Sequence, residues 1–368
     1  MPSWLAVYAG RAALPSELMP AVWHAHEMIF GYAAAVVAGF LLTAIPNWTG
    51  RMPLQGAALA ALVLLWAGGR IAVLLSGMIG ATAAAMVDLS FPAVFLAVVA
   101  REILVGRNWR NLPMIGALSL LLAGNALVHL EPLGIADSAG LGNRVGLATL
   151  LMLISLVGGR IIPSFTHNWL SKKHPEAALP APAGRFDLAA LFVNGLALAG
   201  WVAPPDAAIA SWAALIAGAV TAIRLSRWKG RHTFGEPLLL VLHIGYGWLG
   251  LGLLLLGLNG LFHILPATAA LHALTVGAVG TMTLAVMTRA SLGHTGRPLR
   301  AGPGTEAIYV LITLAALSRV LSPLAGDEAD LALWLAGISW TAAFGLFVAC
   351  YGGPLAQPRV VGDQARPI

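Results

Sequence analysis

Residues 23–45 read WHAHEMIFGYAAAVVAGFLLTAI, and this stretch decides the fold class. From Met28 onward it is predominantly apolar, and a helix needs roughly 20 such residues to cross a bilayer. Comparable runs follow along the chain at 54–75, 79–100, 112–130, 143–163, 187–203, 207–226, 236–257, 268–289, 305–323 and 331–351. The sequence therefore predicts an all-α, polytopic transmembrane helix bundle of about eleven spans.

The composition supports the same class. The chain has 368 residues, of which 59% are hydrophobic and only 10% are charged, whereas soluble proteins average about 45–50% apolar and about 25% charged residues. The bases behind the net charge of +6 are scattered over short loops, which argues against a nucleic-acid partner, since such a surface needs clustered Lys and Arg. We expect a single integral-membrane helical domain over residues 1–368, surrounded by the lipid bilayer, and no soluble domain.

Charge is distributed asymmetrically over the loops. If the runs alternate in direction, one side collects the basic residues Arg51, Arg101, Arg107, Arg110, Lys172, Lys173, Arg185, Arg224, Arg227, Lys229, Arg231, Arg297, Arg300, Arg359 and Arg366. The other side collects Glu131, Asp137, Asp206, Asp327, Glu328 and Asp330. Because basic loops face the cytoplasm, we expect a multi-pass protein with a cytoplasmic C-terminus.

Histidines are the residues best suited to carry chemistry in these spans, since polar groups at membrane depth are costly and often functional. His24 and His26 stand beside Glu27 at the start of the first run. On a regular helix His24 and Glu27 share a face, while His26 points elsewhere. The pair could serve one metal or two centres, or it could be interfacial and bond to loop carbonyls.

Two further histidines lie in apolar runs. His272 is followed by Gly277 and Gly280, which remove side-chain bulk from one stripe of the helix. Such a stripe suits either close helix packing or a flat macrocycle against the backbone. His243 precedes Tyr246 by three residues, so both can face one pocket. Imidazole is a good ligand for iron, copper and zinc.

Charged residues offer further alternatives. Asp88 and Arg70 fall within the apolar layer, where they form either a mutual ion pair or part of a proton path. Arg160 and Arg289 lie near inner helix ends, where they either snorkel or hold haem propionates, because Arg binds carboxylates in a bidentate way. The single cysteine, Cys350, excludes an internal disulfide and a Cys-rich metal site.

Three stretches resemble the NnrS family, described as haem- and copper-containing membrane proteins of the bacterial nitric oxide response. They are WHAHEMIFGYAAAVVAGFLLTAIPNWTGR at 23–51, GGRIIPSFTHNW at 158–169 and LHALTVGAVGTMTLAVMTRASLGHTGRPL at 271–299. The resemblance extends over nearly the whole chain. It implies twelve spans, and only Met1 to Gly10 stand where the first of them would lie.

The resemblance implies a haem, expected to be b-type, and copper. The metal-ligand candidates on or near the matching stretches are His24, His26, His243, His272, His294 and, more weakly, His167. Arg160, Arg289 and Tyr246 are the candidates for further contacts with the cofactor. His272 and His294 are about 33 Å apart along a continuous helix, so they cannot share a metal. The first centre we expect is built on His24, His26 and His272.

The implied function is that of a bacterial inner-membrane haem/copper protein that binds or mitigates nitric oxide, in nitrosative stress and denitrification. An activity as a nitric oxide-related oxidoreductase stays open; it would need electrons, for which quinol is the expected source. The alternatives are a multi-span transporter of a metal or small solute, and a sensor or assembly factor that carries metal without turnover. The sequence leaves the oligomeric state undetermined.

Overall fold

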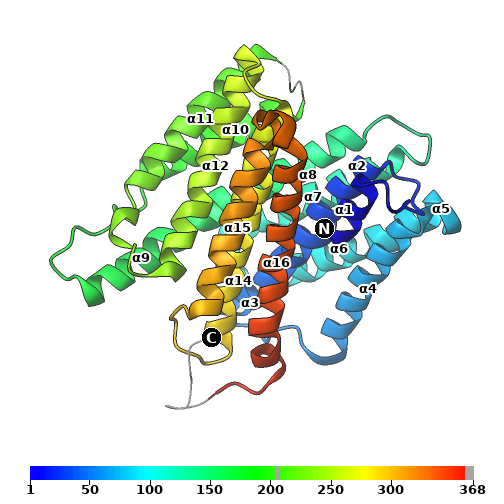
Figure 1. Ribbon diagram of the computed structural model, residues 1–368. Helices are drawn as coiled ribbons and strands as arrows, with labels where there is room; N and C mark the ends of the chain where they lie inside the picture. Colours follow the sequence, from blue (N-terminus) through cyan, green and yellow to red (C-terminus); the bar gives the residue numbers. More distant parts are fainter. Residues whose placement is uncertain (204, 206, 361–368) are drawn as a thin grey trace. The chain divides into compact units, whose positions relative to one another are not determined.

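The computed structural model of the chain describes residues 1–203, 205 and 207–360 (Figure 1). Asp206 and the C-terminal residues 361–368, which include Arg366, lie outside the described residues. The expectations for the charge at these positions and for the side of the C-terminal end therefore stay predictions.

Helices are the only regular secondary structure in the described part of the chain. In order they are α1 (Pro2–Tyr8), α2 (Pro20–His26), η1 (Glu27–Ala33), α3 (Ala34–Thr49), α4 (Gly56–Leu74), α5 (Ser76–Ile79), α6 (Ala81–Val105), η2 (Trp109–Asn111), α7 (Leu112–Leu130), α8 (Ala139–Leu153), η3 (Ile154–Gly158), α9 (Gly159–Lys173), α10 (Arg185–Val202), α11 (Ala208–Ser226), η4 (Gly230–His232), α12 (Pro237–Phe262), α13 (Ala267–His272), η5 (Ala273–Gly280), α14 (Thr281–His294), α15 (Pro303–Leu321), η6 (Ser322–Leu324), η7 (Gly326–Glu328) and α16 (Ala329–Ala356). The elements η1, η3 and η5 are π-helices.

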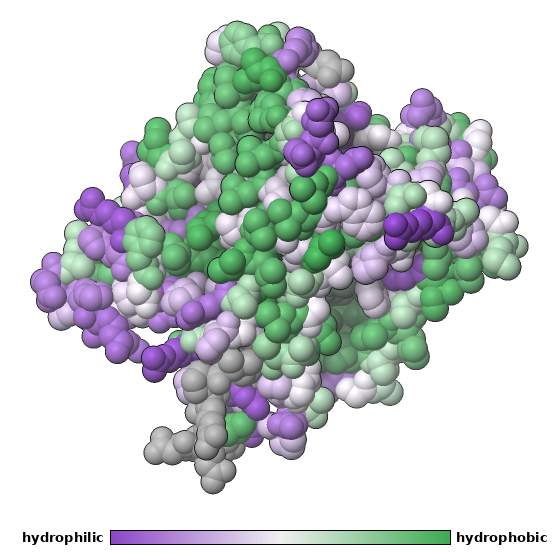
Figure 2. Space-filling view, viewed as in Figure 1, coloured by the Kyte–Doolittle hydropathy of each residue, from purple (hydrophilic) through white to green (hydrophobic). Residues whose placement is uncertain are grey.

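Within the described residues, adjacent elements join into eleven helices that are long and apolar enough to cross a membrane. Proline in the first turn of α2, α7, α12 and α15 helps to start four of them. Figure 2 shows hydrophobic side chains along the helices, with hydrophilic ones gathered over α9 and the loop that follows it. The predicted polytopic helical bundle is confirmed, and the chain is a multi-pass membrane protein.

Two local expectations need correction. The polar composition of the stretch 166–185 predicts a loop, but α9 continues to Lys173. Arg224 was expected in a basic loop, but it lies inside α11 and is only 2% exposed. An ion pair with the buried Asp187 compensates its charge, which a count of loop charges does not reveal.

The chain divides into two compact units. The first, Ala6–Leu150, holds the spans from α2 to most of α8. Within it α4 packs on α6, and α6 packs on α7. Helices α7 and α8 approach closely where Gly124 meets Gly142: a Cβ on Gly142 would lie 2.5 Å from the Gly124 carbonyl oxygen.

The second unit comprises Met1–Leu5 and the chain from Leu151 onward. Helix α12 packs against α11, and α15 packs against α16 (Figure 1). The π-helix η5 lies against α12, where a Cβ on Gly277 would lie 2.6 Å from the Trp248 ring. The prediction of a single domain over the whole chain stays a prediction.

Candidate metal centre

A π-helix shapes the start of the first span. His26 is the last residue of α2, and η1 begins at Glu27. His26 Nδ1 lies 3.2 Å from Glu27 Oε1, although a regular helix was expected to turn these two side chains apart. Within this π-helix the Gly31 carbonyl oxygen accepts a hydrogen bond from the Trp66 indole, at 2.9 Å. The expected geometry was wrong because it assumed 3.6 residues per turn.

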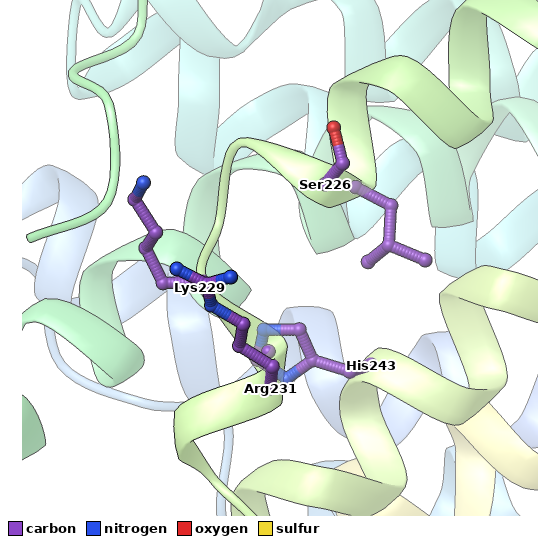
Figure 3. Close-up of a pocket in the computed structure, with 6 residues that line it drawn as sticks. Ser226, Lys229, Arg231 and His243 are labelled. Carbon is purple, nitrogen blue, oxygen red and sulfur yellow. The ribbon is translucent and has the colours of Figure 1, made fainter.

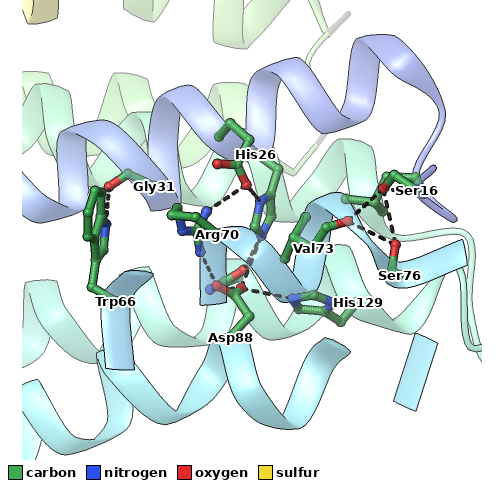
Figure 4. Close-up of polar contacts among 12 residues, drawn as sticks. Ser16, His26, Gly31, Trp66, Arg70, Val73, Ser76, Asp88 and His129 are labelled. Atoms are coloured by element: carbon green, nitrogen blue, oxygen red, sulfur yellow. Dashed lines mark hydrogen bonds and ion pairs between the residues drawn. The ribbon is translucent and has the colours of Figure 1, made fainter. Parts of the chain in front are cut away.

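Asp88 of α6 is at the centre of a buried polar cluster (Figure 4). Its carboxylate forms an ion pair with Arg70 of α4. Its Oδ2 accepts hydrogen bonds from Asn125 Nδ2 and His129 Nε2 of α7, each at 2.9 Å. The same oxygen lies 3.2 Å from His26 Nε2. The predicted ion pair between Asp88 and Arg70 is therefore present, and it belongs to a larger network.

Glycines make room for this network. A Cβ on Gly69 would lie 2.8 Å from Asp88 Oδ1, and a Cβ on Gly31 would lie 2.8 Å from Arg70 Nη1. Larger residues would therefore push the carboxylate and the guanidinium out of place. Asp88 and His26 are fully buried, and His129 is nearly so.

The hydrogen bonds around His26 leave one position that calls for a cation. A carboxylate only accepts, so His26 Nδ1 carries its proton toward Glu27. Because Asn125 directs its amide N–H at Asp88, its Oδ1 is the atom that lies 2.7 Å from His26 Nε2. In a neutral imidazole Nε2 is then a lone pair facing two acceptor oxygens. A proton or a metal ion at Nε2 would remove this repulsion.

A charge count agrees with the geometry. Glu27 and Asp88 carry two negative charges, while Arg70 supplies one positive charge through ion pairs with both. One negative charge is left uncompensated when both imidazoles are neutral. Since an unbalanced buried charge is costly, the cluster favours one added positive charge.

The cluster also has the donor set of a metal site. His26, Asp88 and His129 each offer a ligand atom, and these atoms all lie within 4.8 Å of one another. Two imidazoles and a carboxylate suit several transition metals. Glu27, hydrogen-bonded to the far nitrogen of His26, would orient that ligand as such partners commonly do.

A family model described as NnrS protein matches residues 1–359. The chain belongs to the NnrS family. No curated protein and no solved structure is similar to it. Membership makes this chain a membrane protein of a family related to the nitric oxide response.

In this NnrS-family chain, sequence reasoning did not propose His129 or Asn125 as site residues. Both stand in the apolar run of α7, four residues apart and therefore on one helix face. A polar pair at that spacing in a membrane span was the signal that could have found them. The expected centre on His24, His26 and His272 draws on both units, and it stays a prediction.

His243 and His272 share a different arrangement, and both lie in the second unit. His243 Nδ1 lies 3.0 Å from the Leu239 carbonyl oxygen, and His272 Nδ1 lies 2.6 Å from that of Thr268. Each Nδ1 therefore holds its proton, and the Nε2 lone pair is left to accept. His243 Nε2 is buried without a hydrogen-bond partner among the described residues.

Side chains of neighbouring helices fill the space beside the glycines that follow His272. A Cβ on Gly277 would lie 2.6 Å from the Trp248 ring, and one on Gly280 would lie 3.3 Å from Ile312. Close helix packing thus accounts for the stripe, and no flat macrocycle is needed there. His272 and His294 lie at opposite ends of the span Ala267–His294, so they cannot bind a common metal.

The other predicted site residues are dispersed. His24 is half-buried, whereas His167 and His294 are exposed at α9 and the end of α14. Arg289 lies over the Phe165 ring, 4.1 Å from its centroid, and Arg160 is exposed on α9. Their roles toward a metal or haem stay predictions.

Tyr246 belongs to a second buried network that centres on Arg224. Arg224 Nε pairs with Asp187 at 2.9 Å, and its Nη1 donates to the Tyr246 hydroxyl at 2.9 Å and to the Ser155 carbonyl oxygen at 3.0 Å. Gly159 is needed beside it, because a Cβ there would lie 2.2 Å from Arg224 Nη2. This network is balanced in charge, so it calls for no additional cation.

Proposed function

We propose that this protein binds nitric oxide at a metal centre within the bacterial inner membrane and thereby mitigates nitrosative stress. Membership of the NnrS family supports the connection to nitric oxide. The observation that carries the proposal is the buried cluster of His26, Asp88 and His129, which has a ligand set and an uncompensated negative charge.

We assign copper to this cluster. The two imidazole nitrogens and the Asp88 carboxylate would be its ligands, and a single positive charge would balance the cluster. Arg70 and Asn125 hold Asp88 in place, while Glu27 fixes the tautomer of His26. Burial of all three ligands keeps water away from the centre.

Haem needs an imidazole nitrogen with a free lone pair, and His272 supplies one. Its Nδ1 is held by the Thr268 carbonyl oxygen, which fixes the ring orientation as in other metal-bound histidines. A ferrous haem or reduced copper with an open coordination position binds nitric oxide, which partitions into lipid. Any turnover would draw electrons from a donor such as quinol.

The test is metal analysis and an ultraviolet–visible spectrum of the detergent-purified protein, reduced and then exposed to nitric oxide. We expect bound metal and a spectrum that shifts on exposure. His129→Ala should lose copper, and His272→Ala should lose or alter the haem spectrum. His263→Asn, at the far end of α12, is the matched control and should retain both.

Two results would count against the proposal. A wild-type protein that binds neither haem nor copper when both are supplied would leave the cluster as a proton-bearing structural network and favour the transporter alternative. Full copper content in His129→Ala would show that copper does not bind at the assigned ligands.

We also propose that the C-terminus is cytoplasmic, because the basic loops gather on the same predicted side. A C-terminal alkaline phosphatase fusion should be inactive, and a green fluorescent protein fusion should fluoresce. The reverse pattern would overturn the topology.

A further inference from the structure

A basic loop and a cavity lie together where α11 ends. The cavity has a volume of about 490 Å³ and is lined by Leu225, Ser226, Lys229, Gly230, Arg231 and His243. In Figure 3 the side chains of Lys229 and Arg231 lie on one side of this cavity, and Ser226 lies across from them. Most of the remaining wall is apolar. The cavity therefore presents two cations beside an apolar surface.

The positive charge at this cavity has no counter-ion. The sequence from 207 to 235 contains four bases and no acidic residue. Arg224 is neutralised by the buried Asp187. Lys229 and Arg231, in contrast, form no ion pair within the described part of the chain. Two cations at one cavity, without a carboxylate nearby to pair with them, favour an anionic ligand.

The loop holds both cations in defined positions. Trp228, directly before Lys229, is 1% exposed and anchors the start of the loop. Gly230 lies against the His243 ring, since a Cβ there would be only 2.5 Å from its Cδ2. Lys229 has a left-handed backbone, with φ +60°, which is uncommon outside glycine. Lys229 and Arg231 flank the anchored glycine, so their backbone positions are set before a ligand binds.

The two side chains match the chemistry of a phosphate group. Lysine and arginine offer hydrogen-bond donors only. Arg231 Nε donates to His232 Nε2 at 3.3 Å, which leaves the two terminal nitrogens of the guanidinium for a ligand. Arginine binds the oxygens of a phosphate through such paired N–H groups. Basic pockets beside transmembrane helices are a common form of binding site for phospholipid headgroups.

An apolar face of α11 leads to this cavity. Trp212, Ile216 and Ile223 are each more than half exposed, and their spacing places them on one face of the helix, which ends at Ser226. Acyl chains can lie along this face while a headgroup occupies the cavity. A soluble anion would make no use of the apolar face, so the arrangement favours a lipid over free phosphate.

We propose that this cavity binds the headgroup of an anionic phospholipid. Lys229 and Arg231 bind the phosphate, and the exposed face of α11 contacts the acyl chains. A zwitterionic lipid carries an ammonium group of its own, which two cations repel, so the cavity selects a headgroup with net negative charge. Anionic lipids lie in the cytoplasmic leaflet, on the side where the basic loops are expected. The site requires no metal and is independent of the proposed copper and haem centres.

Two lipids and inorganic phosphate test the proposal on the full-length, detergent-purified protein. The lipids are phosphatidylglycerol and phosphatidylethanolamine with identical acyl chains, each titrated and followed by native mass spectrometry. The first phosphatidylglycerol should bind with a Kd about 25-fold lower than that of phosphatidylethanolamine, about fivefold for each base. Inorganic phosphate at the same concentration should not displace it. Equal Kd values for the two lipids, or displacement by inorganic phosphate, would overturn the proposal.

Variants then locate the site. Lys229→Gln combined with Arg231→Gln should weaken phosphatidylglycerol binding about 25-fold, to the level of phosphatidylethanolamine. Lys172→Gln combined with Lys173→Gln removes the same charge from the exposed end of α9 and should retain the wild-type affinity. Thermal unfolding without lipid verifies that each variant is folded, and the comparison of lipids on the wild type needs no variant. Equal weakening by the two double variants would mean that lipid is attracted to the basic surface as a whole, and it would overturn the assignment to this cavity.

Discussion

His26 and His243 are both buried histidines in membrane-spanning helices, but their surroundings differ. Each ring nitrogen of His26 faces oxygens, within a cluster that carries one uncompensated negative charge. His243 Nδ1 is bonded to the Leu239 carbonyl oxygen, and its Nε2 is buried without a hydrogen-bond partner among the described residues. The first environment favours an added cation, whereas the second holds the ring beneath the loop that follows α11. Burial of a histidine therefore does not define its chemistry, whereas the atoms that face its nitrogens do.

Removing the central carboxylate should have the largest effect on the His26 environment. Asp88→Asn leaves Arg70 and two histidines without their shared partner, and breaking a buried pair costs about 3–5 kcal/mol. We expect a large fall in the thermal unfolding temperature and loss of copper. Asp137→Asn, at an exposed loop position, should change neither. Unaltered stability of Asp88→Asn would contradict the central role of this residue.

Variants of the Arg224 network test whether a charge-balanced buried network is separate from metal binding. Arg224→Met should cost about 3 kcal/mol, because it leaves Asp187 buried and uncompensated. The double variant with Asp187→Leu should recover most of this loss, since the pair is removed together. Metal content should stay at the wild-type level throughout. Loss of metal with either variant would mean that the two environments are not distinct.

The loop against His243 can be disturbed without touching the histidine. Gly230→Ala places a methyl group against the imidazole and should cost about 1–3 kcal/mol through overpacking. Thermal unfolding in detergent measures this loss. Gly235→Ala is the matched control, because a Cβ there meets nothing within 4 Å. Equal unfolding temperatures for the two variants would show that the loop can move away from the imidazole.

The same substitution at the two histidines should give opposite results. His26→Leu should destabilise the protein, because it removes a member of a connected network. His243→Leu replaces a buried nitrogen that lacks a hydrogen-bond partner among the described residues with an apolar group, so it should raise stability by up to about 1 kcal/mol. Thermal unfolding of both variants in one detergent compares them directly. Equal destabilisation by His26→Leu and His243→Leu would show that the two histidines do not differ in their contribution to stability.

Much of the fold could be predicted, because each span has to be apolar over a length set by the bilayer. The runs at 54–75 and 79–100, for example, correspond closely to α4 and α6. The site was harder to predict. Asp88 and Arg70 were recognisable as a pair, but their link to His129 depends on which faces of α6 and α7 meet. Apolar helices carry almost no signal for that, since lipid-facing and buried positions have similar residues.

The π-helix after His26 has a consequence for changes in chain length. Each residue of an α-helix advances the direction of its side chain by about 100°, and a π turn holds one residue more than an α turn. Relaxation of Glu27–Ala33 to an α-helix at unchanged length would therefore rotate His26 away from Asp88. Deletion of one residue would compensate for that relaxation, because an α turn completes the same rotation with one residue fewer. A single deletion in this segment should thus preserve the helical phase of the centre, whereas an insertion, or a substitution that favours a regular α-helix, should disturb it.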